Sequence, residues 1–158
     1  MITIRLLQEQ RFFAALSDDA LRVLARITRS ETFTPGETIF QASDAGRSLY
    51  LIRRGEVKVS VAAPDGEQFT LTILKDGDMF GAMSFVDETT RSATIAAISA
   101  VETLVIEKSE FEALMNDNPQ MVLTVMQEIV RTAHSIVRGM NARYIEMITY
   151  MWGRKRFC

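Results

Sequence analysis

The sequence has almost no cysteine or histidine, which limits the chemistry that it can carry. Its single cysteine, Cys158, cannot form a disulfide within the chain, and we expect it to be an idle terminal thiol. A metal site would need several clustered ligands, but the chain has one histidine, His134, which we place on a helix surface or at an interface. No serine or cysteine arrangement typical of an activated nucleophile is visible. The sequence therefore predicts no metal site and no enzyme.

The chain also lacks a net positive charge and a run long enough to span a membrane. The formal net charge is −2, and the one dense basic cluster, at residues 154–156, fits a solvated tail. The uncharged run at residues 92–101 is far shorter than the roughly 20 residues that a spanning helix needs. Arg5 and the lack of a small-residue cleavage site argue against a signal peptide. We expect a cytoplasmic protein without a membrane partner.

Apolar residues make up 47% of the sequence, which is enough for a core, and they occur in three successive patterns. Residues 1–30 show helical spacing, with Ser17 as the expected N-cap of a helix. Residues 31–107 have the character of β-strands, and residues 108–158 are helical again. We therefore expect a single domain that is mainly β, with helices at both ends.

Turn residues divide the β region into short strands. Such regular turns are typical of a sandwich or barrel, and glycines occur here every nine to eleven residues, at positions 36, 46, 55, 66 and 77. Alternation at residues 56–61 predicts that the valines face one way and Ser60 faces the other, and a second alternating run follows at residues 69–73. Pro64 and Gly66 between the runs favour a turn, so the two runs should form a hairpin.

A long helix is predicted from Asn118 and Pro119 onward, because proline suits a first helical turn. Ser109 is expected to cap a shorter helix before it. Two adjacent apolar stripes follow the long helix at heptad spacing: Met126, Ala133, Met140 and Met147 with Val122, Ile129, Ile136 and Tyr150, and beside them Leu123, Val130, Val137, Tyr144 and Met151.

A helix with two apolar faces needs two partners. We expect residues 119–151 to pack on their own β region and on the same helix of a second subunit, which gives a homodimer. The alternative is a helix that is buried wholly within one subunit.

Residues 80–94 are the most informative segment of the chain. Gly81 opens a short apolar turn, and Arg91 follows ten residues later, beside Ser92. Glycine permits a close approach of the backbone, N–H groups at a helix start attract an anion, and a guanidinium can bind two phosphate oxygens. These features predict a site for one phosphate. The alternative is a local salt bridge between Arg91 and Asp87 or Glu88.

Several short motifs, in this order and spacing, resemble the landmarks of the cyclic-nucleotide-binding domain family: LSDD at 16–19, PGE at 35–37, LYLIRRGEV at 49–57, GDMFG at 77–81 and RSAT at 91–94. The resemblance covers about residues 12–138. It implies an eight-stranded jelly-roll β-barrel with N-terminal helices, a phosphate-binding cassette at 80–93 and a long C-terminal dimerisation helix. Relatives of the catabolite-activator branch append a helix-turn-helix, and we expect no DNA-binding unit within these 158 residues.

The resemblance also assigns roles to the residues of the cassette. Gly81 and the backbone N–H groups of Met83 and Ser84 would line the phosphate. Arg91 would pair with the exocyclic phosphate oxygens, and Ser92 would donate its hydroxyl to the phosphate or to the base.

Two features depart from what the family has at the matching positions. A glutamate that holds the ribose 2′-hydroxyl in the family is replaced by Ala82, which cannot accept a hydrogen bond. Ile136 and Val137 lie about where family members place polar groups against the purine, so they can pack on a base but cannot read its edge. We therefore expect weaker binding and poor selectivity between bases.

Together these observations predict a regulatory domain that binds a cyclic nucleotide, such as cAMP or cGMP, and needs no cofactor. Ligand phosphate would order the cassette and shift the C-terminal helix and its dimer contact. The alternative is a degenerate module of the same fold, which dimerises or docks on a partner without binding nucleotide.

Overall fold

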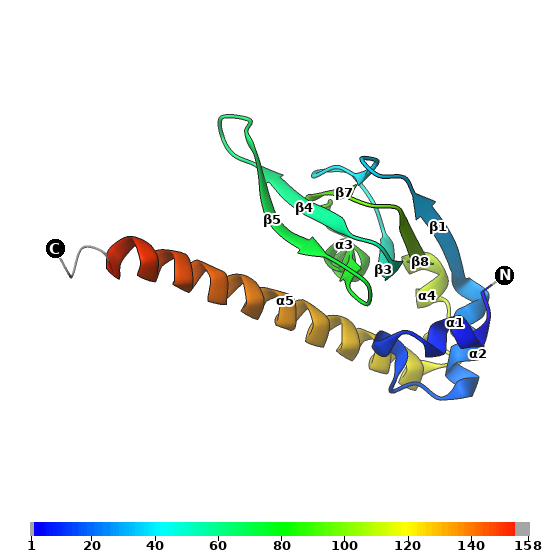
Figure 1. The fold of residues 1–158 in the computed structure, drawn as a ribbon. Coiled ribbons are helices and arrows are strands. Elements are labelled where there is room, and N and C mark those ends of the chain that lie inside the picture. Colours follow the sequence, from blue (N-terminus) through cyan, green and yellow to red (C-terminus); the bar gives the residue numbers. More distant parts are fainter. Residues whose placement is uncertain (1, 154–158) are drawn as a thin grey trace.

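Eight strands form two antiparallel four-stranded sheets in the computed structural model, which describes residues 2–153 (Figure 1). The strand orders are β1-β8-β3-β6 and β2-β7-β4-β5. The strands are β1 (Thr28–Phe33), β2 (Thr38–Phe40), β3 (Ser48–Arg54), β4 (Val57–Ala62), β5 (Gln68–Leu74), β6 (Met79–Phe80), β7 (Thr94–Ala97) and β8 (Val101–Glu107). The expected eight-stranded jelly roll with helices at both ends is confirmed. The first strand begins at Thr28, a little earlier than the predicted boundary.

The helices precede, interrupt and follow the strands: α1 (Ile4–Gln8), the 3-10 helix η1 (Arg11–Phe13), α2 (Asp18–Ile27), α3 (Ala82–Asp87), α4 (Lys108–Glu112) and α5 (Pro119–Gly153). Ser17 caps α2 as predicted, since its Oγ accepts a hydrogen bond from the N–H of Ala20 at 3.2 Å. The predicted cap at Ser109 is wrong. Ser109 lies inside α4, and the residue at the cap position, Glu107, makes no capping bond with its side chain.

The predicted hairpin is present and is formed by β4 and β5. Strands β4 and β5 pair antiparallel, with Val59 opposite Thr72 and Ser60 opposite Thr70, so the register shifts by one residue at Leu71. Such a bulge reverses the faces that the following residues present. The extra residue is in β5, whereas β4 keeps a regular register with β7, with Val59 opposite Ile95 and Ser60 opposite Thr94.

The core consists of two clusters on opposite faces of the β1-β8-β3-β6 sheet. One lies between that sheet and the helices and includes Leu24, Leu104 and Phe85. The other fills the space between the sheets and includes Ile52, Ile95 and Val105. Helix α3, which contains Phe85, is therefore held between the β-roll and α5.

Helix α5 is 35 residues long, which corresponds to about 52 Å. Figure 1 shows it running beneath the β-roll and continuing past it. In its N-terminal half Val122, Val125 and Ile129 are buried against the rest of the chain. On the adjacent face the second predicted stripe is exposed: Leu123, Val130, Val137, Tyr144 and Met151.

Two sequence predictions fall on the end of the chain. Both Cys158 and the basic cluster at residues 154–156 lie outside the described residues. Within residues 2–153, none of the helices combines the length and the apolar character needed to cross a bilayer.

Candidate functional site

One cavity of about 370 Å³ is lined by all eight residues that the sequence singled out: Gly81, Ala82, Met83, Ser84, Arg91, Ser92, Ile136 and Val137. The first six belong to the cassette, which connects β6 of one sheet to β7 of the other, and the last two come from α5. Strand residues of the hairpin and the barrel complete the walls, among them Phe40, Leu71, Leu74 and Phe80. The fold therefore brings together residues that are more than 50 positions apart in the sequence.

The turn into α3 requires glycine. Gly81 follows strand β6 and precedes the first residue of α3, with φ at +78°, in the left-handed region. A Cβ atom on Gly81 would lie 2.7 Å from Nη1 of Arg91 and 2.7 Å from the carbonyl oxygen of Ser48. The N–H groups in the first turn of α3, which include those of Met83 and Ser84, have no acceptor within the helix. Met83 and Ser84 both line the cavity, and their role as a phosphate cradle stays a prediction.

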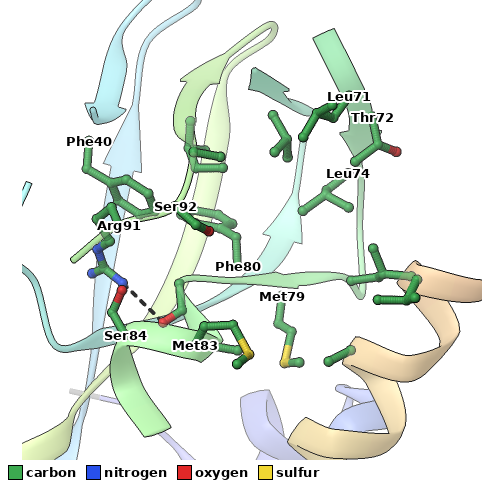
Figure 2. A pocket seen from close by; sticks show the side chains of 18 of the residues that line it. Phe40, Leu71, Thr72, Leu74, Met79, Phe80, Met83, Ser84, Arg91 and Ser92 are labelled. Atoms are coloured by element: carbon green, nitrogen blue, oxygen red, sulfur yellow. Dashed lines mark hydrogen bonds between the residues drawn. The ribbon is translucent and has the colours of Figure 1, made fainter. Parts of the chain in front are cut away.

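Arg91 is held at one end of the cavity by two backbone carbonyls and an aromatic ring. Its Nη1 donates to the carbonyl oxygen of Gly81 and its Nη2 to that of Ser48, both at 3.1 Å. Its Cζ lies 4.2 Å from the ring centroid of Phe40, within the range of a cation–π interaction. Figure 2 shows the guanidinium between Phe40 and Ser84. These contacts fix the direction in which the positive charge points.

The charge of Arg91 is buried without a carboxylate partner. The residue is 4% exposed, and within residues 2–153 it forms no salt bridge. Burial lowers the pKa of the guanidinium, although the more distant charges of Tyr50, Glu107 and Asp44 act in the opposite direction. The alternative of a local salt bridge is wrong, because Glu88 instead lies 3.4 Å from Lys108. A buried cation of this kind attracts an anion.

A network on the far side of Ser48 anchors the segment that holds Arg91. The Oγ of Ser48 donates to Oε1 of Glu107 at 2.7 Å, and Nη2 of Arg29 lies 2.8 Å from the same oxygen. Burial acts to raise the pKa of Glu107, but the hydrogen bonds from Ser48 and Arg29 outweigh it and lower this pKa. The cassette is thereby connected to β8 and β1.

An aromatic cluster lies behind the cavity. The rings of Tyr50 and Phe80 stack with centroids 4.7 Å apart, and Phe40 lies 5.8 Å from Phe80. Burial raises the pKa of Tyr50, with a further contribution from the charge of Glu31. These rings give the cavity a rigid floor and place Phe40 against Arg91.

Some residues of the site had no signal in the sequence. Gly46 marked only a turn, yet a Cβ on it would lie 2.6 Å from Nε of Arg91, so this glycine makes room for the guanidinium. Ser48 and Phe40 also contact Arg91, although they lie 43 and 51 positions earlier. Pairing over such distances follows from the sheet topology and has no local pattern. Within residues 2–153, no group of three or more potential metal ligands is present.

A family model described as the cyclic nucleotide-binding domain matches residues 30–118 of this chain. Among curated proteins, a "CRP-like cAMP-activated global transcriptional regulator" of Mycobacterium tuberculosis is 26% identical over 136 residues, which is 86% of this chain and 59% of that protein. A "Cyclic AMP receptor protein" of Thermus thermophilus is 30% identical over 107 residues, 68% of this chain and 50% of the relative. The chain therefore spans between half and three-fifths of these relatives.

Solved structures show the same fold. A cyclic nucleotide-binding domain from Methylobacillus flagellatus has a TM-score of 0.81 at 21% identity, covering 91% of this chain and 81% of the other. The N-terminal domain of a transcriptional regulator from Streptomyces coelicolor has a TM-score of 0.71 at 26% identity, and the match covers 85% of this chain and 94% of the other. Both curated relatives described above are named as regulators or receptors.

Proposed function

Because the chain belongs to the cyclic nucleotide-binding domain family, we propose that it is a regulatory domain that binds an anionic ligand in the cavity at the cassette. In this proposal the ligand is a cyclic nucleotide, such as cAMP or cGMP, and its phosphate contacts Arg91. Helix α5 passes the effect of binding to a second copy of the chain. The domain acts by binding and carries out no catalysis.

The buried, unpaired charge of Arg91 is the observation that carries the proposal. A guanidinium has five N–H donors, and two of its nitrogens already donate to the carbonyls of Gly81 and Ser48. These bonds leave further N–H donors for an anion in the cavity. The open cavity of about 370 Å³ beside this charge argues against the alternative of a module that binds no ligand.

The position of α5 supports the proposed transfer of the signal. Ala133, Ile136, Val137 and Met140 of this helix form one wall of the cavity, so a ligand there contacts the helix directly. The stripe that begins at Leu123 and contains Val130, Val137, Tyr144 and Met151 is exposed, and a continuous apolar surface of this kind is typical of an interface. Binding can shift the helix only as far as the ligand's affinity differs between the two arrangements.

Calorimetric titration with cAMP and with cGMP tests the proposal on the wild type, Ala82→Glu and Arg91→Gln. We expect weak binding by the wild type, because Ala82 accepts no hydrogen bond from the ribose. Ala82→Glu should tighten nucleotide binding about ten- to a hundredfold, since a hydrogen bond to a charged group contributes about 1.5–3 kcal/mol. Arg91→Gln should abolish binding.

Thermal unfolding of each variant serves as the control, because Arg91 also supports the backbone. Ala82 lines the cavity and its side chain makes no hydrogen bond, so its substitution tests the site separately from Arg91→Gln. Because Ala82 is 9% exposed and belongs to the core, thermal unfolding must show that Ala82→Glu is folded. Nucleotide binding that is as tight in a folded Arg91→Gln variant as in the wild type would sink the assignment of the phosphate site.

A further inference from the structure

Lys108 is a buried charge that the proposed ligand contacts do not use. It is the first residue of α4, directly after β8, and it is 8% exposed. A lysine is rarely buried this deeply unless its ammonium group is paired. The partners of Lys108 lie on two different helices, so this residue connects them.

The ammonium of Lys108 contacts α3 at two points and its own helix at one. Its Nζ donates to the carbonyl oxygen of Val86 at 3.1 Å and lies 3.4 Å from Oε1 of Glu88. Val86 belongs to the last turn of α3, where carbonyls lack a donor within the helix and the helix dipole favours a cation. On α4, Oε1 of Glu112 lies 3.7 Å from the same Nζ.

Helix α3 is thus held by a cation at each end. Arg91 donates to the carbonyl oxygen of Gly81, directly before the helix, and Lys108 donates to that of Val86 in its last turn. The first turn of the same helix lines the cavity. Because α3 is only six residues long, a displacement of its last turn also moves the cavity wall.

The junction at Lys108 also includes α5. A small cavity of about 70 Å³ lies where the three helices meet, and its lining includes Val86 of α3, Lys108 and Phe111 of α4, and Val122 and Met126 of α5. Close-packed interiors resist displacement, whereas a void of this kind leaves room for side chains to repack. A movement of α3 at this point is therefore felt by α5.

The contact between Lys108 and α3 can be lost without leaving a charge unpaired. Glu112 is four residues after Lys108 on the same helix, so this pair stays together when α3 moves. Glu88 also has a second cation, since Nη1 of Arg47 lies 3.8 Å from its Oε1. An isolated buried charge would oppose the movement, but here each charged group keeps a partner.

We infer that Lys108 is a positioning residue: its contact with the last turn of α3 fixes the cassette in the arrangement described above, and this contact is released when the cassette moves. The inference rests on the proposed function, because it concerns how the same cavity is regulated. Affinity falls when the binding-competent arrangement is less populated. The two carboxylates that share Lys108, Glu88 on the α3 side and Glu112 on α4, therefore act on nucleotide affinity in opposite directions.

Glu88→Gln and Glu112→Gln are a matched pair of variants, because both carboxylates are about half exposed and each change removes one negative charge beside Lys108. Calorimetric titration with cAMP measures the affinities. We expect Glu88→Gln to weaken binding about two- to fivefold and Glu112→Gln to strengthen it by a similar factor, as for a partly exposed ion pair. Glu110→Gln is the control, since Glu110 is an exposed acid of α4 without an ion pair within residues 2–153, and it should leave the affinity unchanged.

Amide hydrogen exchange without nucleotide tests the contact by itself. The N–H of Glu88 donates to the carbonyl oxygen of Ser84 at 3.1 Å, so its exchange reports opening of the last turn of α3. Lys108→Met keeps an unbranched side chain but loses the ammonium, and it should raise this exchange at least about tenfold relative to amides of the central strand β8. Lys108→Arg keeps a charged donor and should stay near the wild-type rate.

Two sets of results separate this inference from the proposed function. If exchange in α3 rises no more than in β8, or if Glu88→Gln and Glu112→Gln do not change cAMP affinity in opposite directions, the inference is wrong, while cAMP binding that depends on Arg91 still supports the proposed function. If the wild type does not bind cAMP, the proposed function falls, and the exchange of α3 decides whether Lys108 positions the cassette.

Discussion

Arg91 is the proposed ligand contact, and its position is set by residues from other parts of the chain. Its guanidinium lies between the carbonyls of Gly81 and Ser48 and the ring of Phe40, and it approaches the backbone at Gly46. A guanidinium has five N–H donors, and Arg91 lines the cavity with two of its nitrogens already bonded to these carbonyls. The geometry of the proposed anion site therefore depends on side chains and backbone groups far from Arg91 in the sequence.

Gly46→Ala is the most direct test of this dependence. The new Cβ would lie 2.6 Å from Nε and 2.8 Å from Nη2 of Arg91, so the guanidinium has to move. We expect a loss of stability of about 1–3 kcal/mol, as for other overpacked sites, together with loss of Arg91-dependent ligand binding. Thermal unfolding and calorimetric titration measure the two effects.

Gly139→Ala is the matched control for Gly46→Ala. Its Cβ would meet no atom within 4 Å, and Gly139 lies within α5, where alanine is about 1 kcal/mol more favourable than glycine. This variant should be as stable as the wild type or more so. A Gly46→Ala protein with unchanged stability and binding would show that Arg91 does not depend on the space at Gly46.

At the scale of the elements, the sequence predicted strands, hairpin and long helix well, because their patterns are local. Heptad spacing predicted both stripes of α5. It did not predict which stripe packs on the chain itself and which is exposed. In the structure Ile129 of the first stripe is 1% exposed and packs on its own chain, whereas Val130 of the second is 65% exposed. The bulge at Leu71 in β5 likewise follows from strand pairing, which no local alternation reveals.

Neighbouring substitutions on α5 distinguish its two faces. Val130→Glu should leave the monomer folded, with a change in stability within about 0.5 kcal/mol as is usual at exposed positions, but should convert the proposed dimer to monomers. Ile129→Glu should unfold the chain, because it buries an unpaired charge in the core. Sedimentation velocity gives the mass, and thermal unfolding gives the stability. A dimer that persists in Val130→Glu would place the interface elsewhere.

At the scale of the whole molecule, the cavity and the exposed stripe share the same helix. Val137 belongs to both, since it lines the cavity and lies in the stripe with Val130 and Tyr144. A helix transmits a displacement along its length, so a ligand that prefers one position of α5 also prefers one arrangement of the stripe. The sequence could not predict this connection, because it depends on where the β-roll places the cassette relative to α5.

If the chain dimerises through this stripe as proposed, ligand binding and dimerisation are reciprocal. If the ligand changes the dimerisation constant by some factor, dimerisation must change the ligand affinity by the same factor, which is typically about 5- to 150-fold for coupled sites. We therefore expect cAMP to bind the monomeric Val130→Glu variant with an affinity that differs from that of the proposed wild-type dimer by that factor. Calorimetry measures the affinities, and sedimentation with and without cAMP measures dimerisation. Equal affinities for dimer and monomer would show that ligand binding in the cavity is not coupled to the dimer interface.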